Sequence, residues 1–173
     1  LHGAATSAEA RAIYIFPTKA LAQDQLRALR KLCAAGATSP FGLPAGTYDG
    51  DTPQGDRAAL RRDARVLLTN PDMLHCTLLP NHKQWEHVLA HLRYVVIDEA
   101  HMYRGVFGAH VACILRRLRR LASLYGASPT FACCSATLGN PRELFGDLTG
   151  LTEPLVVTDD GSPHGARTLL LWN

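Results

Sequence analysis

The sequence predicts an α/β fold in which helices cover a mainly parallel sheet. Short uninterrupted apolar runs, such as residues 11–16 and 93–98, alternate with longer amphipathic segments. Apolar runs of this kind are typical of strands that are buried on both faces of a parallel sheet. Polar clusters, "PTK", "TNPD", "DEAH" and "SAT", follow four of these runs. Because ligands bind beyond the carboxyl ends of such strands, the clusters predict a single functional edge.

The pattern predicts each element in turn. Strands are expected at 11–16, 65–70, 93–98 and 129–136, with a short strand at 47–50 and late strands at 154–157 and 168–172. From Thr18 a helix is expected, followed by a Gly- and Pro-rich connection over 34–46. A second helix begins near Pro53, and a long one covers about 107–125. The apolar face of the long helix is expected to contain Val111, Ile114, Leu115, Leu118, Leu121, Ala122 and Tyr125.

Two helix starts carry capping signals. Asn70 is followed by Pro71, a side-chain cap and then proline at the first helical position. Asn140 and Pro141 repeat this pair, and Glu143 stands where a capping box needs a carboxylate.

Length and composition describe an ordinary globular domain. The 173 residues are enough for one domain with a core, and they are 47% hydrophobic and 19% charged. A net charge of +3 permits nucleic-acid binding without arguing for it. No apolar run approaches the ~20 residues of a membrane span, so no membrane partner is expected. The odd number of cysteines predicts reduced thiols of an intracellular protein: Cys33, Cys76, Cys113, Cys133 and Cys134.

Asp98 and Glu99 are adjacent carboxylates at the end of an apolar run. A strand-end aspartate is typical of the Mg²⁺ anchor in nucleotide hydrolysis, and the neighbouring glutamate can orient or deprotonate the attacking water. The alternative is a helix start at which acidic residues are favoured by the helix dipole.

The whole set of motifs, "PTKAL", "TNPDML", "DEAH" and "SAT", resembles in its order the first RecA-like domain of superfamily 2 DEAD/DEAH-box helicases. The longer strings "DEAHMYRGVFGAHVACILRRLRRL" and "DGSPHGARTLLLWN" are similar to the Hrq-type/RecQ4-like group of ATP-dependent DNA helicases. This resemblance implies a three-layer RecA-like domain of the P-loop NTPase type over 1–173. It also implies ATP and Mg²⁺ as cofactors, with Asp98 holding Mg²⁺ through ATP. The implied partner is DNA, as single strand and duplex junction, in preference to RNA.

The resemblance implies that three loops bind the nucleic-acid backbone. Thr18 begins a helix whose free N–H groups can hold a phosphate, and Lys19 adds positive charge. For this helix start and for the one at Asn70, simple capping of the helix is the alternative. The implied contacts are Pro17, Thr18 and Lys19 (motif Ia), Gly50, Asp51 and Thr52 (a glycine turn), and Thr69, Asn70, Pro71 and Asp72 (motif Ib).

The remaining motif residues are implied to couple the sites. His101 would connect the ATP site to a second domain, and Ser135, Ala136 and Thr137 match motif III, which couples nucleotide and nucleic-acid binding. The alternative for motif III is a pair of satisfied strand-end hydroxyls. A serine nucleophile is disfavoured because no Gly-x-Ser-x-Gly elbow surrounds Ser135.

Other polar and aromatic clusters receive structural interpretations. The arginines at 116, 117, 119 and 120 are expected on a solvated helix face rather than on nucleic acid. His82, His87, His91 and Cys76 do not have the spacing of a zinc site as a set, so no structural zinc is expected. Trp85 and Trp172 are expected to pack in the core or at an edge rather than to stack on bases.

The phosphate-loop string Gly-x-x-x-x-Gly-Lys-Ser/Thr does not occur in 1–173. The resemblance places it upstream of motif Ia, and a second domain with an arginine finger after residue 173. We therefore expect a partial domain whose sheet is incomplete at its N-terminus. Such a fragment should be marginally stable and should not hydrolyse ATP at a useful rate by itself.

The resemblance implies a whole protein that unwinds DNA with ATP, moving 3′-to-5′, inside the cell and in the nucleus if the organism is eukaryotic. Two alternatives stay open. One is a catalytically silent module that binds nucleic acid or a protein partner. The other is an unrelated parallel α/β enzyme, such as a phosphatase-like or hydrolase fold.

Overall fold

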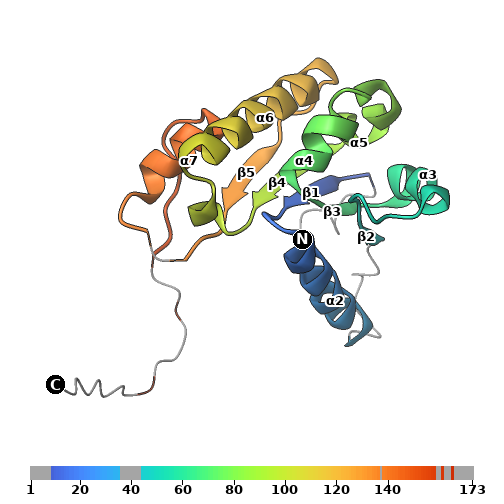
Figure 1. Cartoon of the computed structure of the whole chain (residues 1–173), viewed down its shortest axis with the longest axis horizontal. Helices are drawn as coiled ribbons and strands as arrows, with labels where there is room; N and C mark the ends of the chain where they lie inside the picture. Colours follow the sequence, from blue (N-terminus) through green and yellow to red (C-terminus); the bar gives the residue numbers. More distant parts are fainter. Residues whose placement is uncertain (1–8, 36–43, 137, 159–160, 162–164, 166–173) are drawn as a thin grey trace.

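A single parallel sheet organises the chain (Figure 1). The structure is a computed structural model that describes residues 9–35, 44–136, 138–158, 161 and 165. The strand order is β2-β3-β1-β4-β5, and every neighbouring pair is parallel. The predicted parallel α/β fold is therefore confirmed. The strands are β1 (Arg11–Ile15), β2 (Ala45–Thr47), β3 (Val66–Thr69), β4 (Leu92–Ile97) and β5 (Thr130–Cys133).

Helices lie on both faces of the sheet, which gives three layers (Figure 1). One face is covered by α2 (Lys19–Ala35) over β1 and β3, where Phe16, Ala22 and Leu26 form a small cluster. The other face carries the larger core and most of the helices. These are α3 (Gln54–Asp63), α4 (Pro71–Met73), the π-helical turn η1 (Leu74–Leu78), the 3-10 turns η2 (His82–Trp85) and η3 (Ala100–Met102), α5 (Glu86–Ala90), α6 (Gly105–Leu124) and α7 (Pro141–Thr149).

The central strand β1 sets the register of the sheet. Ile13 lies opposite Leu67 of β3 and Val95 of β4, and all three side chains belong to the larger core. Full burial of one such aliphatic side chain contributes about 1.5–3 kcal/mol. Successive residues point to opposite faces, so Ala12 and Phe16 are buried on the side of α2.

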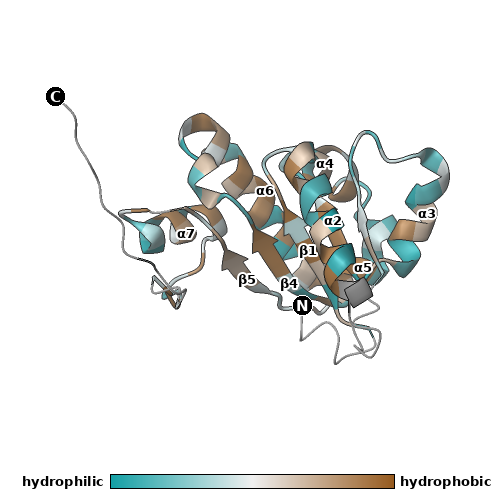
Figure 2. Cartoon of the chain, turned by 90° about the horizontal axis from the view of Figure 1, so that it is seen from below, coloured by the Kyte–Doolittle hydropathy of each residue, from teal (hydrophilic) through white to brown (hydrophobic). Residues whose placement is uncertain are grey.

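The long helix α6 is the main cover of β4 and β5. Its predicted apolar face is confirmed: Val111, Leu115 and Leu118 are buried in the larger core. Figure 2 colours most of α6 and β4 as hydrophobic. Gly108 lets the helix start close to the preceding chain, because a Cβ at this position would lie 2.4 Å from the carbonyl oxygen of Tyr103.

The predicted strand at 154–157 is wrong. In this segment Leu155 is 92% exposed and Val157 is 77% exposed, and no strand is formed. An apolar run becomes a strand only where a neighbouring strand offers its edge, and β5 pairs with β4 alone in the described part of the chain. The other late strand, at 168–172, lies outside the described residues together with Trp172.

The short strand β2 precedes the predicted position by two residues, because the chain already turns at Asp49. Trp85 is buried in the core as expected, with its ring edge-on to Tyr48.

Asn140 occupies the predicted N-cap position of α7, but it does not cap the helix with its side chain. Its side chain makes no cap hydrogen bond and donates instead to Glu143 Oε2, at 2.7 Å.

Part of the arginine strip on α6 has a structural role. Arg116 donates to the carbonyl oxygen of Asp147 at 3.0 Å, and Arg119 donates to those of Thr149 and Gly150, both at 3.1 Å. These carbonyls lie at the C-terminus of α7, where backbone acceptors lack helical partners and cations are favoured. The two side chains therefore attach α7 to α6.

A buried arginine from β1 caps the C-terminus of α3. Arg11 is only 5% exposed, and its guanidinium donates to the carbonyl oxygens of Ala64 and Arg62, the latter at 2.7 Å. Burial lowers the pKa of this guanidinium, and the charge of Arg65 lowers it further. Arg11 thus ties the beginning of the central strand to the C-terminus of a helix that lies far away in the sequence.

We predict that Arg11→Met lowers the free energy of unfolding by about 2 kcal/mol, because it leaves one buried and one partly buried carbonyl without a donor. Urea unfolding followed by circular dichroism measures the change. Arg120→Met removes an exposed arginine of α6 and should stay within about 0.5 kcal/mol of the wild type. Equal stability of the two variants would contradict the capping role of Arg11.

Candidate nucleotide and nucleic-acid site

The carboxyl ends of the five strands form one edge that carries the described residues of the predicted motifs. Backbone hydrogen bonds continue beyond the strand ends and connect the loops. The N–H of Asp98 donates to Ile15, that of Phe16 to Thr69 and that of Cys134 to Ile97, each at 2.9 Å. The motif loops therefore share one edge of the sheet, as expected, and each loop begins from a fixed backbone position.

The chain turns sharply between Asp98 and Ala100. Glu99 has φ 50° and ψ 43°, the left-handed conformation that costs a side-chain-bearing residue about 1–2 kcal/mol. Two hydrogen bonds hold it there: Asp98 Oδ1 accepts from the Glu99 N–H at 2.9 Å, and the Ala100 N–H donates to Cys134 at 2.9 Å. This turn sets the directions of two half-buried carboxylates.

The carboxylates fit a hard divalent cation. Carboxylate oxygens are the ligands that Mg²⁺ prefers, usually alongside water and substrate phosphates. One oxygen of Asp98 is occupied by the Glu99 N–H, and the side chain stays partly exposed. Its second oxygen is therefore available to a cation or to cation-bound water.

His101 contacts both the acidic turn and the loop after β5. Its Nδ1 lies 3.2 Å from Glu99 Oε2 and 3.4 Å from Ser135 Oγ. The structure thus brings together the acidic motif and the serine that follows β5, as the resemblance implies. Ala136 is exposed at the same edge, and Thr137 lies outside the described residues.

The neighbouring thiols are not suited to nucleophilic or metal chemistry. Burial raises the pKa of Cys133 to about 12, and the nearby Cys134 thiol adds to this effect. The pKa of Cys134 is raised by burial and then by the charges of Asp98 and Glu99. Both thiols are therefore protonated at neutral pH. Across the described residues, no group of three or more His, Cys, Asp or Glu side chains is placed to hold a metal ion.

Helix α2 begins at the loop after β1, as predicted. Thr18 Oγ1 accepts from the Leu21 N–H at 3.4 Å, which caps the helix. Lys19 projects from the first turn, and its Nζ lies 3.0 Å from Asp51 Oδ2. Two of the three predicted binding loops are therefore in direct contact.

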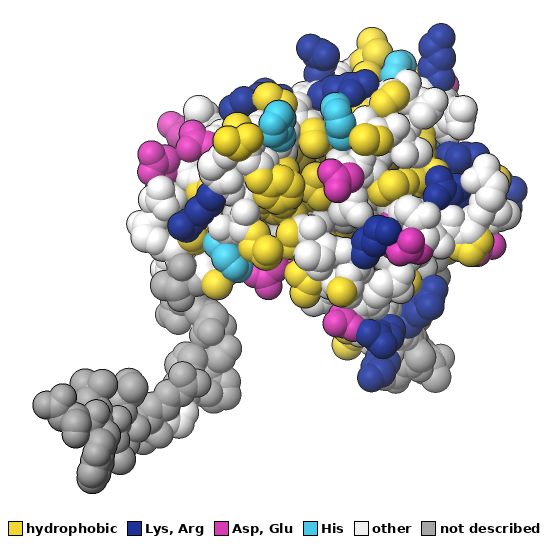
Figure 3. Space-filling view, in the orientation of Figure 1, with side chains coloured by type: hydrophobic (Ala, Val, Ile, Leu, Met, Phe, Trp, Pro, Cys, Tyr) yellow, Lys and Arg dark blue, Asp and Glu magenta, His cyan; other side chains and the backbone are white. Residues whose placement is uncertain are grey.

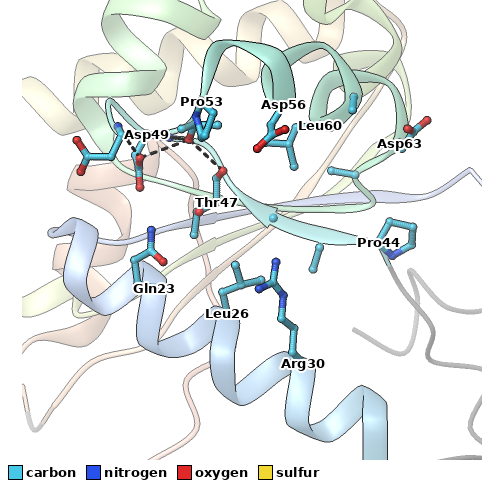
Figure 4. A pocket seen from close by; sticks show the side chains of 16 residues that line it. Gln23, Leu26, Arg30, Pro44, Thr47, Asp49, Pro53, Asp56, Leu60 and Asp63 are labelled. Atoms are coloured by element: carbon cyan, nitrogen blue, oxygen red, sulfur yellow. Dashed lines mark hydrogen bonds between the residues drawn. The ribbon is translucent and has the colours of Figure 1, made fainter.

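The glycine turn is built by a residue that the sequence interpretation missed. Asp49 is 2% exposed, and its Oδ1 accepts from the Asp51 N–H at 2.9 Å and from the Thr52 hydroxyl at 3.4 Å (Figure 4). An aspartate that bonds the backbone two residues later is a common turn former, so Asp-Gly-Asp is the signal that was available.

Arg57 holds the same turn from α3. Its guanidinium donates to the carbonyl oxygens of Thr52 at 3.1 Å and Asp49 at 3.2 Å, and it lies over the ring of Tyr48. No local pattern in the sequence indicates this contact.

The loop after β3 uses most of its predicted binding residues internally. The Thr69 hydroxyl donates to the carbonyl oxygen of Tyr48 at 2.7 Å, and Asn70 Oδ1 accepts from the Met73 N–H at 2.9 Å. The capping role of Asn70 is therefore confirmed. Pro71 is buried, so Asp72 is the one exposed side chain among residues 69–72.

A hollow of about 420 Å³ lies beside the glycine turn, between α2, β2 and α3 (Figure 4). The charged side chains of its lining are mostly acidic: Asp49, Asp51, Asp56 and Asp63 accompany a single Arg30. Such a lining disfavours phosphate. Figure 3 shows lysine and arginine side chains over α2 and along α6 rather than in one continuous strip on this face.

Comparison with known families identifies the class of protein. The sequence model of the DEAD/DEAH box helicase family matches residues 2–144, which include every motif of this edge. The chain belongs to the DEAD/DEAH box helicase family, and its fold is that of a RecA-like helicase domain.

Individual relatives show which helicases the chain is similar to. The chain is 47% identical over 167 residues to the ATP-dependent helicase HRQ1 of Saccharomyces cerevisiae, covering 95% of this chain and 15% of that protein. It is 46% identical to the uncharacterized ATP-dependent helicase YprA of Bacillus subtilis, covering 94% of this chain and 21% of that protein. The crystal structure of the DUF1998 helicase MrfA bound to DNA and AMPPNP matches with a TM-score of 0.87 and 46% identity, over 94% of this chain and 22% of that chain.

No helix of the described chain has the length and apolarity needed to cross a membrane.

The left-handed turn at Glu99 makes a prediction about stability. Glu99→Gly should be more stable than Glu99→Ala by about 1 kcal/mol, because glycine adopts this conformation without a Cβ penalty. Thermal unfolding of both variants measures the difference. The same pair at Glu143, inside α7, should show the opposite order, because alanine is favoured in helices. A more stable alanine variant at residue 99 would contradict the strained geometry.

Proposed function

We propose that this chain is the nucleotide-binding, RecA-like part of an ATP-dependent DNA helicase. One observation carries the proposal: the Asp98–His101 turn and the loops at 17–19 and 50–52 lie at one edge of one sheet. The family membership supports it, as do relatives that are named ATP-dependent helicases. The chain spans about a fifth or less of those relatives, so activity is proposed for the whole protein.

In this proposal the acidic turn serves ATP hydrolysis. Mg²⁺, when bound with ATP, would neutralise charge on the phosphates. Asp98 would hold the cation through its free carboxylate oxygen. Glu99 would orient the attacking water and accept its proton at Oε1 or Oε2. His101 lies 3.2 Å from Glu99 Oε2 and 3.4 Å from Ser135 Oγ, so it is placed to transmit a change in the glutamate to the loop after β5.

The nucleic-acid strand would cross the loops on the α2 side of this edge. Lys19 and the N-terminus of α2 would contact phosphates, and the exposed turn at Gly50 would let the backbone come close. Contacts of this kind carry little sequence preference. We propose DNA as substrate, at a junction of single strand and duplex, with 3′-to-5′ movement. Action inside the cell, in the nucleus of a eukaryote, belongs to the same proposal.

The decisive variant is Glu99→Gln in the full-length protein. It removes the proton acceptor and keeps the shape of the side chain, so DNA-stimulated ATP turnover should fall about 10²–10⁴-fold. Phosphate release measures turnover, and fluorescence anisotropy with a labelled oligonucleotide should show unchanged DNA binding.

Glu143→Gln serves as the matched control, because it makes the same change on exposed α7. If the wild-type full-length protein binds DNA without any ATP turnover, the chain belongs to a catalytically silent binding module. Loss of turnover in both variants alike would refute the role of Glu99.

A further inference from the structure

Lys19 is paired with an acid that belongs to the same candidate binding surface. Its Nζ lies 3.0 Å from Asp51 Oδ2, and the side chains of Lys19 and Asp51 are 47% and 74% exposed. The ammonium also lies over Gly50, because a Cβ at that glycine would be 3.3 Å from Nζ. The strongest positive group of the first loop is thus held over the second loop by a neighbouring carboxylate.

Most backbone N–H groups of the glycine turn are already used within the turn and cannot bind a phosphate. The N–H of Asp51 donates to Asp49 Oδ1 at 2.9 Å, and the N–H of Thr52 donates to the Asp49 carbonyl at 3.3 Å. In the described part of the chain, only the N–H of Gly50 has no partner within this turn. A phosphate that binds here therefore depends on the Lys19 ammonium lying above that N–H.

The acid cannot move far away from the surface. Asp49 and Arg57 fix the backbone on both sides of Asp51 by the hydrogen bonds given above. Asp51 also has no other cationic partner among the described side chains. When a phosphate approaches Lys19, the carboxylate remains within a few ångströms of it.

Two electrostatic effects of Asp51 act in the same direction. An exposed ion pair of this type is worth roughly up to five-fold in equilibrium, which a phosphate must overcome to recruit Lys19. The nearby carboxylate also repels the phosphate at short range. The ion pair also orders the Lys19 side chain, which favours phosphate binding. This favourable effect is small because about half of the side chain is still exposed.

We propose that Asp51 is an intramolecular competitor of nucleic-acid phosphate for Lys19 and limits the affinity of this surface. The inference rests on the proposed function, since it assumes that Lys19 contacts a nucleic-acid backbone.

The test is Asp51→Asn in the full-length protein, measured with a fluorescein-labelled single-stranded oligonucleotide by anisotropy. Asparagine keeps the shape and the backbone N–H of the turn. The dissociation constant at about 50 mM salt should fall about three- to ten-fold, and the gain should shrink at about 300 mM salt because salt screens exposed charges.

Two comparisons make the result specific. Asp56→Asn removes the same charge from the first turn of α3, where no Lys19 contact exists, and should change the affinity less than two-fold. In a Lys19→Met background, Asp51→Asn should lose most of its effect.

Unchanged or weaker binding by Asp51→Asn overturns the inference, and so does an equal gain from Asp56→Asn or in the Lys19→Met background. Each of these outcomes leaves the proposed function intact, provided that the wild type binds the oligonucleotide. A wild-type protein without measurable binding at either salt concentration overturns the proposed function and this inference together.

Discussion

The pairing of β1 with both β3 and β4 is the constraint on which the candidate site depends. All the strands run in one direction, so their carboxyl ends meet at one edge. The acidic turn follows β4 and the Lys19 loop follows β1, the next strand in the sheet. A shift of β1 by one residue would move Ile13 and Ile15 to the other face of the sheet, and the core would not form.

The acidic turn shows how the fold supports a strained site. Glu99 adopts a left-handed conformation that local sequence preference opposes. The turn persists because its ends are fixed by other strands: Asp98 bonds to the end of β1 and Ala100 to the loop after β5. Strain of this kind is retained where the surroundings over-determine the backbone, and such positions concentrate at functional sites.

Local signals made much of the fold predictable. The apolar runs identified β1, β3, β4 and β5, because buried parallel strands need no alternation. The cap at Asn70 and the inner face of α6 depend on residues within a few positions of each other, and both are confirmed. The polar clusters that follow the apolar runs placed the acidic turn and the Lys19 loop at one edge of the sheet, because the carboxyl ends of parallel strands meet there.

What the sequence could not show are contacts between distant segments. Arg11 and Arg119 cap the C-termini of helices that lie far away along the chain. Arg57 supports a turn that already contains hydrogen bonds among its own residues. In the sequence these arginines cannot be told from ordinary surface charges, because only the fold places carbonyl oxygens beside them. The segment at 154–157 failed for the converse reason, because its apolar residues met no strand edge.

Backbone hydrogen bonds join the loops of this edge, and partly exposed side chains supply further contacts between them. Between Asp98 and Lys19 the connection is the end of β1, held by backbone hydrogen bonds to β4 and β3. Coupling between two sites needs an element that has two arrangements. Two side chains at this edge contact a neighbouring loop. His101 Nδ1 lies 3.2 Å from Glu99 Oε2 and 3.4 Å from Ser135 Oγ of the loop after β5, and Lys19 Nζ lies 3.0 Å from Asp51 Oδ2 of the loop after β2. Any communication within this part of the protein is therefore expected to run through these polar contacts rather than through a rearranged sheet.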